Sequence, residues 1–155
     1  MAEPARVFTP RKSRRKTASA RALAQVGEIL EIPLKTQVDV IRLTREGIEP
    51  GAMDELVKRG YRKSDISWVV PARTLTHRRK NHERLTPEES GRWFRAAKLQ
   101  ALAREVLGDD ARALGWLHKP RRAFDGLSAI ELMQTEAGGQ LVEEVLGQLD
   151  AGYFA

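Results

Sequence analysis

The sequence predicts an all-α fold of about eight short helices. In several segments apolar residues recur at the i, i+3, i+4 spacing of one helix face. These segments begin at Ser or Thr and end at Gly or Pro, the residues that favour helix starts and stops. No segment has a convincing alternation of apolar and polar residues, which would be typical of a half-buried strand. A chain of 155 residues fits one domain or two very small ones.

The N-terminal part gives the weakest structural signals. Residues 1–20 are basic and polar, with almost nothing to bury, so we expect them to be disordered. A basic arm of this kind can follow DNA phosphates, although many such tails are merely unfolded. Residues 22–34 are mildly apolar, and their pattern fits either a short helix or an extended segment.

The next two segments predict helices with clear ends. Thr36 is placed to cap the first helix, and Val38 and Ile41, with the flanking Val40 and Leu43, give it an apolar side. Gly47 ends this helix. The second helix begins at Pro50 and ends at Gly60.

Residues 64–80 predict a helix, a break and a second helix. Ser64 is placed to cap a very short first helix. Pro71 ends it, because the proline ring clashes with the preceding turn. The second helix begins near Ala72 and runs to Lys80.

Capping signals are strongest in the C-terminal half. Thr86 and Glu89 form a capping box with a proline at the first helical position, and Ser128 and Glu131 form a second one. The last helix has apolar residues at helical spacing and ends at Gly152. We expect the three tryptophans of the chain to be core residues.

Basic charge is concentrated in two segments of the chain, whose net charge is +6. Residues 1–16 contain six Lys or Arg and one acid, and residues 58–84 contain nine and two. Residues 85–155 contain eight Lys or Arg and eleven acids, so this half is acidic. A localised basic patch is typical of proteins that bind polyanions, because phosphate neutralisation releases counterions. The alternative is a solvated basic surface.

The basic segment predicts a helix-turn-helix. This motif needs a bracing helix, a tight turn and a second helix whose N-terminal side chains reach base edges in the major groove. Arg73 lies at the start of the second helix, where bidentate pairing with guanine is geometrically available. A solvated basic helix is the competing interpretation. The candidate DNA-binding residues are Arg73, Thr74, Thr76, His77, Arg78, Arg79 and Lys80.

Several short motifs follow one another from the basic segment to the end of the chain. They are Arg73-Thr74-Leu75 with Arg78-Arg79, residues 85–90, Trp116-Leu117 with Pro120, residues 124–132, residues 135–138 and residues 146–152. With these motifs, residues from about 36 to 155 resemble antitoxins of the Xre/MbcA/ParS family. The C-terminal motifs are the specific part of this resemblance, because several coincide in order and spacing. Two departures are Ser128-Ala129, where the family often has a proline, and Gly139 near a helix start.

The resemblance implies a two-part organisation behind a basic tail at residues 1–20. An Xre-like helix-turn-helix domain at residues 21–82 would repress the operon's own promoter. A helical toxin-binding domain at residues 83–155 would block the active site of a RES-domain toxin, an enzyme that consumes NAD or transfers ADP-ribose from it. The resemblance also implies a homodimer and a larger complex with the toxin.

Five residues are candidates for contacting the toxin. Tyr153 and Phe154 follow a helix-stopping glycine at the end of the chain, which suggests a docking tail that includes Ala155. Folding back onto their own domain is the alternative. Arg121 and Arg122 lie in a loop, where they could pair with acidic groups of the toxin.

Enzymatic activity is not expected. The three histidines do not lie at i, i+4 spacing and the chain has no cysteine, so neither a metal site nor a cofactor is indicated. There is no phosphate-binding glycine loop and no nucleophile elbow. No apolar run approaches the roughly 18 residues of a membrane helix and no signal peptide is present, so we expect a cytoplasmic protein without a membrane partner.

Two other functions stay open at this point. The chain could be a stand-alone transcription regulator that uses its C-terminal part only to dimerise. It could also be a protein-interaction module without a DNA role, in which case its basic charge would be incidental. A neighbouring gene for a RES-like protein would separate the antitoxin from the stand-alone regulator.

Overall fold

The structure, a computed structural model, describes residues 16–152. Within them it contains eight α-helices, two short 3-10 helices and no strand, which confirms the all-α prediction for this part of the chain. No helix described here is both long and apolar enough to span a membrane. The elements are α1 (Ala18–Ile29), α2 (Gln37–Glu46), α3 (Ala52–Lys58), η1 (Lys63–Asp65), α4 (Ala72–Lys80), α5 (Pro87–Leu107), α6 (Asp110–His118), η2 (Arg122–Phe124), α7 (Ala129–Leu132) and α8 (Glu136–Asp150).

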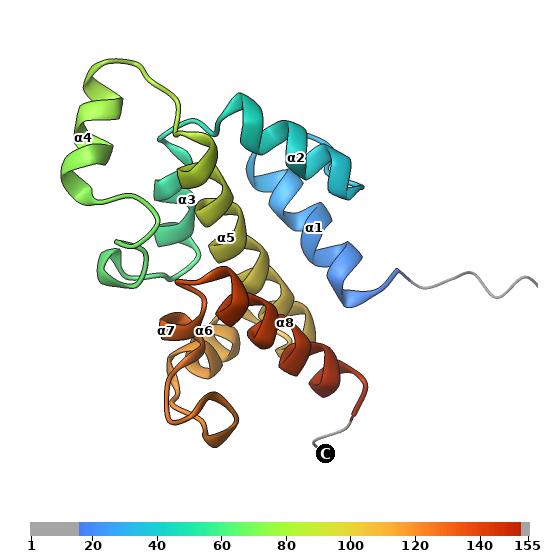
Figure 1. Cartoon of the computed structure of the whole chain (residues 1–155). Coiled ribbons are helices and arrows are strands. Elements are labelled where there is room, and N and C mark those ends of the chain that lie inside the picture. The colour runs from blue at the N-terminus through green and yellow to red at the C-terminus, as the bar shows by residue number, and fades with distance from the viewer. Residues whose placement is uncertain (1–15, 153–155) are drawn as a thin grey trace, which may run out of the picture.

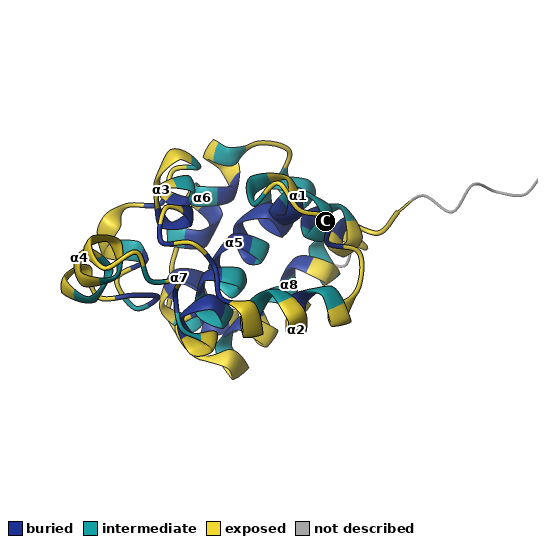
Figure 2. Ribbon diagram, turned by 90° about the horizontal axis from the view of Figure 1, so that it is seen from above, coloured by how far each residue is buried: buried dark blue, intermediate teal, exposed yellow. Residues whose placement is uncertain are grey.

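Helix α5 forms the centre of the molecule (Figure 1). This 21-residue helix contacts α1, α2, α3, α6 and α8. Because neighbours surround it, its buried residues are not confined to one face, and Figure 2 shows buried positions along it. Trp93 is fully buried, and its indole N–H donates to the Ala52 carbonyl oxygen at 2.9 Å. The core assignment of this tryptophan is therefore confirmed.

Helix α1 begins earlier than the sequence predicts. Thr17 caps it, because its hydroxyl accepts a hydrogen bond from the Ala20 backbone N–H at 3.1 Å. Ala18 and Ala22 are buried, and the helix packs along α5. The prediction of disorder for residues 1–20 is therefore wrong from residue 18 onward, because small alanines pack closely without producing a strong apolar pattern. Residues 1–15 lie outside the described residues.

Helix α2 begins where the sequence predicts, but only part of its predicted apolar side is buried. The capping box between Thr36 and Asp39 is present. Val40 is buried, whereas Val38 is 60% and Ile41 is 47% exposed. The expectation that Val38 and Ile41 face the core is therefore wrong, whereas the same expectation for Val40 is confirmed. A short helix at the edge of the fold covers α5 with one narrow face, and Val40 occupies it.

The segment before α4 is not the α-helix that the sequence predicts. Only the single 3-10 turn η1 forms there, and Asp65 caps it in place of Ser64, since its Oδ2 accepts the Arg62 N–H at 2.8 Å. The Trp68 indole N–H donates to the Asp65 carbonyl oxygen at 2.8 Å. Such local bonds compete with helical ones. The α-helix that precedes α4 is therefore α3.

The predicted helix starts of the C-terminal half are confirmed. The Glu89 carboxylate accepts the Thr86 N–H at 2.9 Å, and the Thr86 hydroxyl accepts the Glu89 N–H at 3.2 Å. The Ser128 and Glu131 pair forms the same two bonds at 2.7 and 3.2 Å. Each capping box joins residues only three positions apart, so its pattern can be recognised in the local sequence.

Two adjacent glycines near the start of α8 are required by close contacts. Thr135 caps the helix, since its hydroxyl accepts the Gly138 N–H at 3.0 Å. A Cβ at Gly138 would lie 1.9 Å from the Leu132 carbonyl oxygen. A Cβ at Gly139 would lie 2.6 Å from the Arg95 Cδ. Gly139, a departure from the family pattern, thus lets α8 lie directly against the Arg95 side chain.

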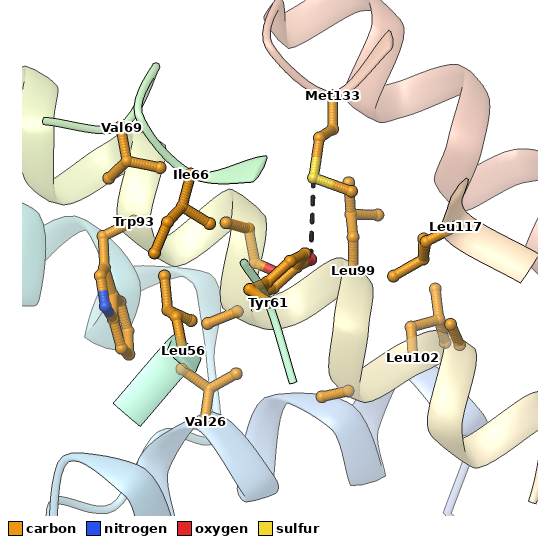
Figure 3. Packing of buried hydrophobic residues seen from close by; sticks show 14 of the residues in the cluster. Val26, Leu56, Tyr61, Ile66, Val69, Trp93, Leu99, Leu102, Leu117 and Met133 are labelled. Carbon is orange, nitrogen blue, oxygen red and sulfur yellow. Dashed lines mark hydrogen bonds between the residues drawn. The ribbon is translucent and has the colours of Figure 1, made fainter. Parts of the chain in front are cut away.

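Buried side chains form one continuous hydrophobic core (Figure 3). It includes Val26 from α1, Leu56 from α3 and Leu117 from α6, together with much of α5. The core crosses the expected domain boundary at residues 82 and 83 without a break. The two parts of the chain therefore share one hydrophobic core. The expected boundary between them separates their expected functions and does not separate two cores.

Candidate functional site

Helix α4 contains the predicted DNA-binding residues and lies at the edge of the molecule (Figure 1). None of its residues is buried, and Leu75 packs partly against the core. Thr74 and Arg78 are half-buried. The exposed members of the predicted set are Arg73, Thr76, His77, Arg79 and Lys80.

Arg78 joins α4 to the body of the protein. Its Nε and Nη2 donate to the two carboxylate oxygens of Glu89, both at 3.0 Å, and its Nη1 donates to Glu83 at 2.9 Å. Only 19% of the Arg78 side chain and 8% of the Glu89 side chain are exposed. This geometry fits an anchor for α4 better than the DNA contact that the sequence predicts.

The pKa values of this cluster reflect the same contacts. Burial opposes ionisation of Glu89, but hydrogen bonds from Arg78 and the Thr86 N–H outweigh it and lower the pKa of Glu89. Hydrogen bonds to Glu89 and Glu83 raise the pKa of Arg78. The pair is therefore ionised at neutral pH, and α4 is attached through charge-assisted hydrogen bonds.

The other polar side chains of α4 differ in whether they already bind a partner within the protein. Arg79 donates to the Asp54 carboxylate of α3 at 2.9 Å, with both side chains largely exposed. The Thr76 hydroxyl donates to the Ala72 carbonyl oxygen at 3.0 Å. Arg73 and Lys80 form no ion pair with any residue in the range 16–152. Within α4, these two cations are therefore the most available to a polyanion.

The two arginines predicted to contact the toxin lie in different environments in the loop between α6 and α7. The Arg121 guanidinium lies 4.4 Å from the Trp116 ring centroid, and its Nη2 donates to the Trp116 carbonyl oxygen at 3.3 Å. Burial lowers the pKa of Arg121. Phe124 packs edge-on against Trp116 at 5.9 Å, which confirms that this tryptophan belongs to the core. Arg121 therefore holds the loop together, whereas Arg122 is exposed.

The remaining predicted contacts, Tyr153, Phe154 and Ala155, lie outside the described residues. Sequence reasoning did not single out Arg95 and His118, which bind the segment before α4 from α5 and α6. His118 and its partner Asp65 are 53 residues apart, so no local pattern connects them. In the described part of the chain, no three acidic or histidine side chains are grouped to hold a metal ion.

Comparison with known proteins identifies the C-terminal part. A family model described as the antitoxin Xre/MbcA/ParS C-terminal toxin-binding domain matches residues 102–152, from the second half of α5 to the end of α8. An antitoxin Xre from Pseudomonas putida is 33% identical over 132 residues, which cover 84% of this chain and 83% of that protein. The chain belongs to the Xre/MbcA/ParS antitoxin family. It therefore binds a toxin through its C-terminal domain and is not an enzyme.

Two further relatives of this antitoxin bear related names. An antitoxin Xre from Yersinia enterocolitica is 34% identical over 87 residues, which cover 56% of this chain and 59% of that protein. A Prs ADP-ribosylating antitoxin from a Sphingobium species is 26% identical over 125 residues, covering 64% and 79% respectively. The resemblance inferred from the sequence motifs is thus confirmed at the level of the family.

Proposed function

We propose that this antitoxin neutralises a RES-domain toxin, which consumes NAD or transfers ADP-ribose from it, by covering the active site of that toxin. The name of the Sphingobium relative joins an antitoxin to ADP-ribosylation, which supports an NAD-using partner. In this proposal residues 83–155 form the toxin-binding unit. Arg122 and the last three residues make direct contacts, and Arg121 maintains the loop through its stacking on Trp116.

The same chain represses its own operon by placing α4 in the major groove of promoter DNA. The observation that supports this is α4 itself, a basic helix at the edge of the fold with no buried residue. Arg73 in its first turn would read a guanine, while Lys80 would contact the backbone. Residues 21–82 form this unit, with α3 as the bracing helix.

The antitoxin acts in the cytoplasm as a homodimer, and it assembles with the toxin into a larger complex. Helix-turn-helix dimers bind half-sites about 34 Å apart, which corresponds to one turn of DNA. A two-fold dimer of this chain would therefore present two copies of α4 to one face of a duplex.

Co-expression of the tagged chain with the protein encoded next to it tests the neutralising role. We expect a stable complex in a pull-down and relief of growth arrest. If no complex forms and growth is not restored, the chain is a stand-alone regulator. Binding to a duplex from upstream of its own coding sequence, measured over a range of salt concentrations, tests the DNA role. If the chain does not bind the duplex, or binds it equally at all salt concentrations, it is a protein-interaction module without a DNA role.

A further inference from the structure

Residues 60–70, here called the leader segment, connect α3 to α4 and lie against the C-terminal half of the protein. Gly60 approaches α6 so closely that a Cβ would lie 2.1 Å from the Leu114 Cδ1. Tyr61 is buried, and its hydroxyl donates to the Ala96 carbonyl oxygen at 2.8 Å and lies 3.8 Å from the Met133 sulfur (Figure 3). The chain that leads into α4 is thus packed on α5, α6 and the end of α7.

His118 binds the turn of the leader segment from α6. Its Nε2 lies 2.9 Å from the Asp65 Oδ2, the oxygen that also accepts the Arg62 N–H. Its Nδ1 lies 2.7 Å from the Leu114 carbonyl oxygen, so both ring nitrogens face acceptors. Since the Asp65 carbonyl oxygen accepts the Trp68 indole N–H, His118 is linked through Asp65 to the residues just before α4.

Arginines of α5 bind the other end of the leader segment. Arg95 donates to the Met133 and Gln134 carbonyl oxygens at 2.7 and 3.1 Å, and its guanidinium lies 5.2 Å from the Trp68 ring centroid. Arg92 donates to the Val69 carbonyl oxygen at 3.0 Å. The carbonyl groups at the end of α7 and the residues next to α4 thus share one contact network.

We infer that His118 and Arg95 are positioning residues for α4, so that the toxin-binding half determines how the DNA-binding helix is presented. This inference rests on the proposed function of α4. The C-terminal end of α4 is anchored by Arg78, but its N-terminal end, where Arg73 lies, continues directly from the leader segment. Neither His118 nor Arg95 needs to touch DNA, because they act through Asp65 and Trp68.

The test uses the full chain and two fluorescent duplexes of equal length, one from upstream of its coding sequence and one of random sequence. We expect His118→Ala to weaken binding to the upstream duplex by about fivefold. The salt slope should stay unchanged, because no phosphate contact is lost. His118→Gln, which keeps a donor within reach of Asp65, should recover part of the affinity. Arg112→Gln, a change at an exposed arginine of the same helix, is the matched control.

Amide hydrogen exchange of residues 72–80 gives a second readout that does not need DNA. His118→Ala should raise exchange at the start of α4, whereas Arg112→Gln should leave it unchanged. Unchanged exchange together with unchanged affinity would overturn the positioning role. A salt slope lowered by about one would also overturn it, since His118 would then contact phosphate itself. A wild-type chain that binds neither duplex would instead refute the proposed DNA function.

Discussion

The ion pair between Arg78 and Glu89 gives the sharpest test of how α4 is held. Glu89→Gln preserves the shape of the side chain and one acceptor for the Thr86 N–H, but it removes the charge that Arg78 binds with two N–H groups. Glu89 is 6% exposed, so the lost bonds are poorly replaced by water. Hydrogen bonds to charged groups contribute about 1.5–3 kcal/mol net, and we expect a loss of about 2 kcal/mol in the free energy of unfolding.

Urea denaturation at neutral pH measures this loss, and Glu88→Gln is the matched control. Glu88 is the exposed neighbour of Glu89 in the first turn of α5, so its replacement should change the stability by less than about 0.5 kcal/mol. Equal effects of the two substitutions would reduce the role of Glu89 to a general preference for acids at a helix start. A Glu89→Gln protein as stable as the wild type would refute the anchoring argument.

The same pair predicts the direction of a pH effect. The pKa of Glu89 is below its ordinary value of 4.5 in the folded chain. A depressed carboxyl pKa contributes stability that is present above the unfolded pKa and is lost as pH falls through the folded pKa. The stability difference between wild type and Glu89→Gln should therefore be constant from neutral pH to about pH 5 and shrink below the ordinary value. A difference that grows on acidification would contradict this sign.

Three further predictions test the sites. Arg73→Ala should weaken binding to the upstream duplex without changing the unfolding midpoint, because a base contact is lost; unchanged affinity at fixed salt would remove Arg73 from the interface. Deletion of residues 153–155 should impair neutralisation in the growth assay more than DNA binding, and full protection by the shortened chain would make this tail dispensable. Gly139→Ala should destabilise the fold by about 1–3 kcal/mol in urea because its Cβ meets Arg95, and a neutral result would mean that the arginine moves aside freely.

The sequence predicts best those features whose physical cause is local. A capping box such as that of Thr86 and Glu89 is complete within four residues, so its pattern is enough to predict where α5 begins. Glycine stops such as Gly47 depend on a left-handed backbone, here with φ of 86°, which glycine adopts at little cost. The predicted helices agree with the structure from α2 to α8 apart from the leader segment and η2, where Arg122 was expected to lie in a loop.

The sequence does not predict features that depend on how the helices pack against one another. Val38 and Ile41 are as apolar as Val40, and only the position of α5 decides which of them is buried. Arg78 looks like any exposed arginine of a basic helix until α5 brings Glu89 next to it. The contact of His118 with Asp65 joins two halves of the chain and has no signature in either segment. The family resemblance therefore predicts toxin binding by the C-terminal half, which the match to residues 102–152 confirms, whereas the residues that contact the toxin or DNA stay predictions.

The central position of α5 restricts how such antitoxins can change partners during evolution. Exchange of genetic material at the linker before α5 would carry this helix away with the toxin-binding half. It would place α1, α2 and α3 against the α5 of another antitoxin, whose side chains are not matched to theirs. With the toxin contacts proposed above, a new toxin specificity is more accessible through substitutions at exposed residues such as Arg122 than through transfer of the whole half between relatives. Chimeras made at residue 82 should accordingly fold poorly even when both parents are stable.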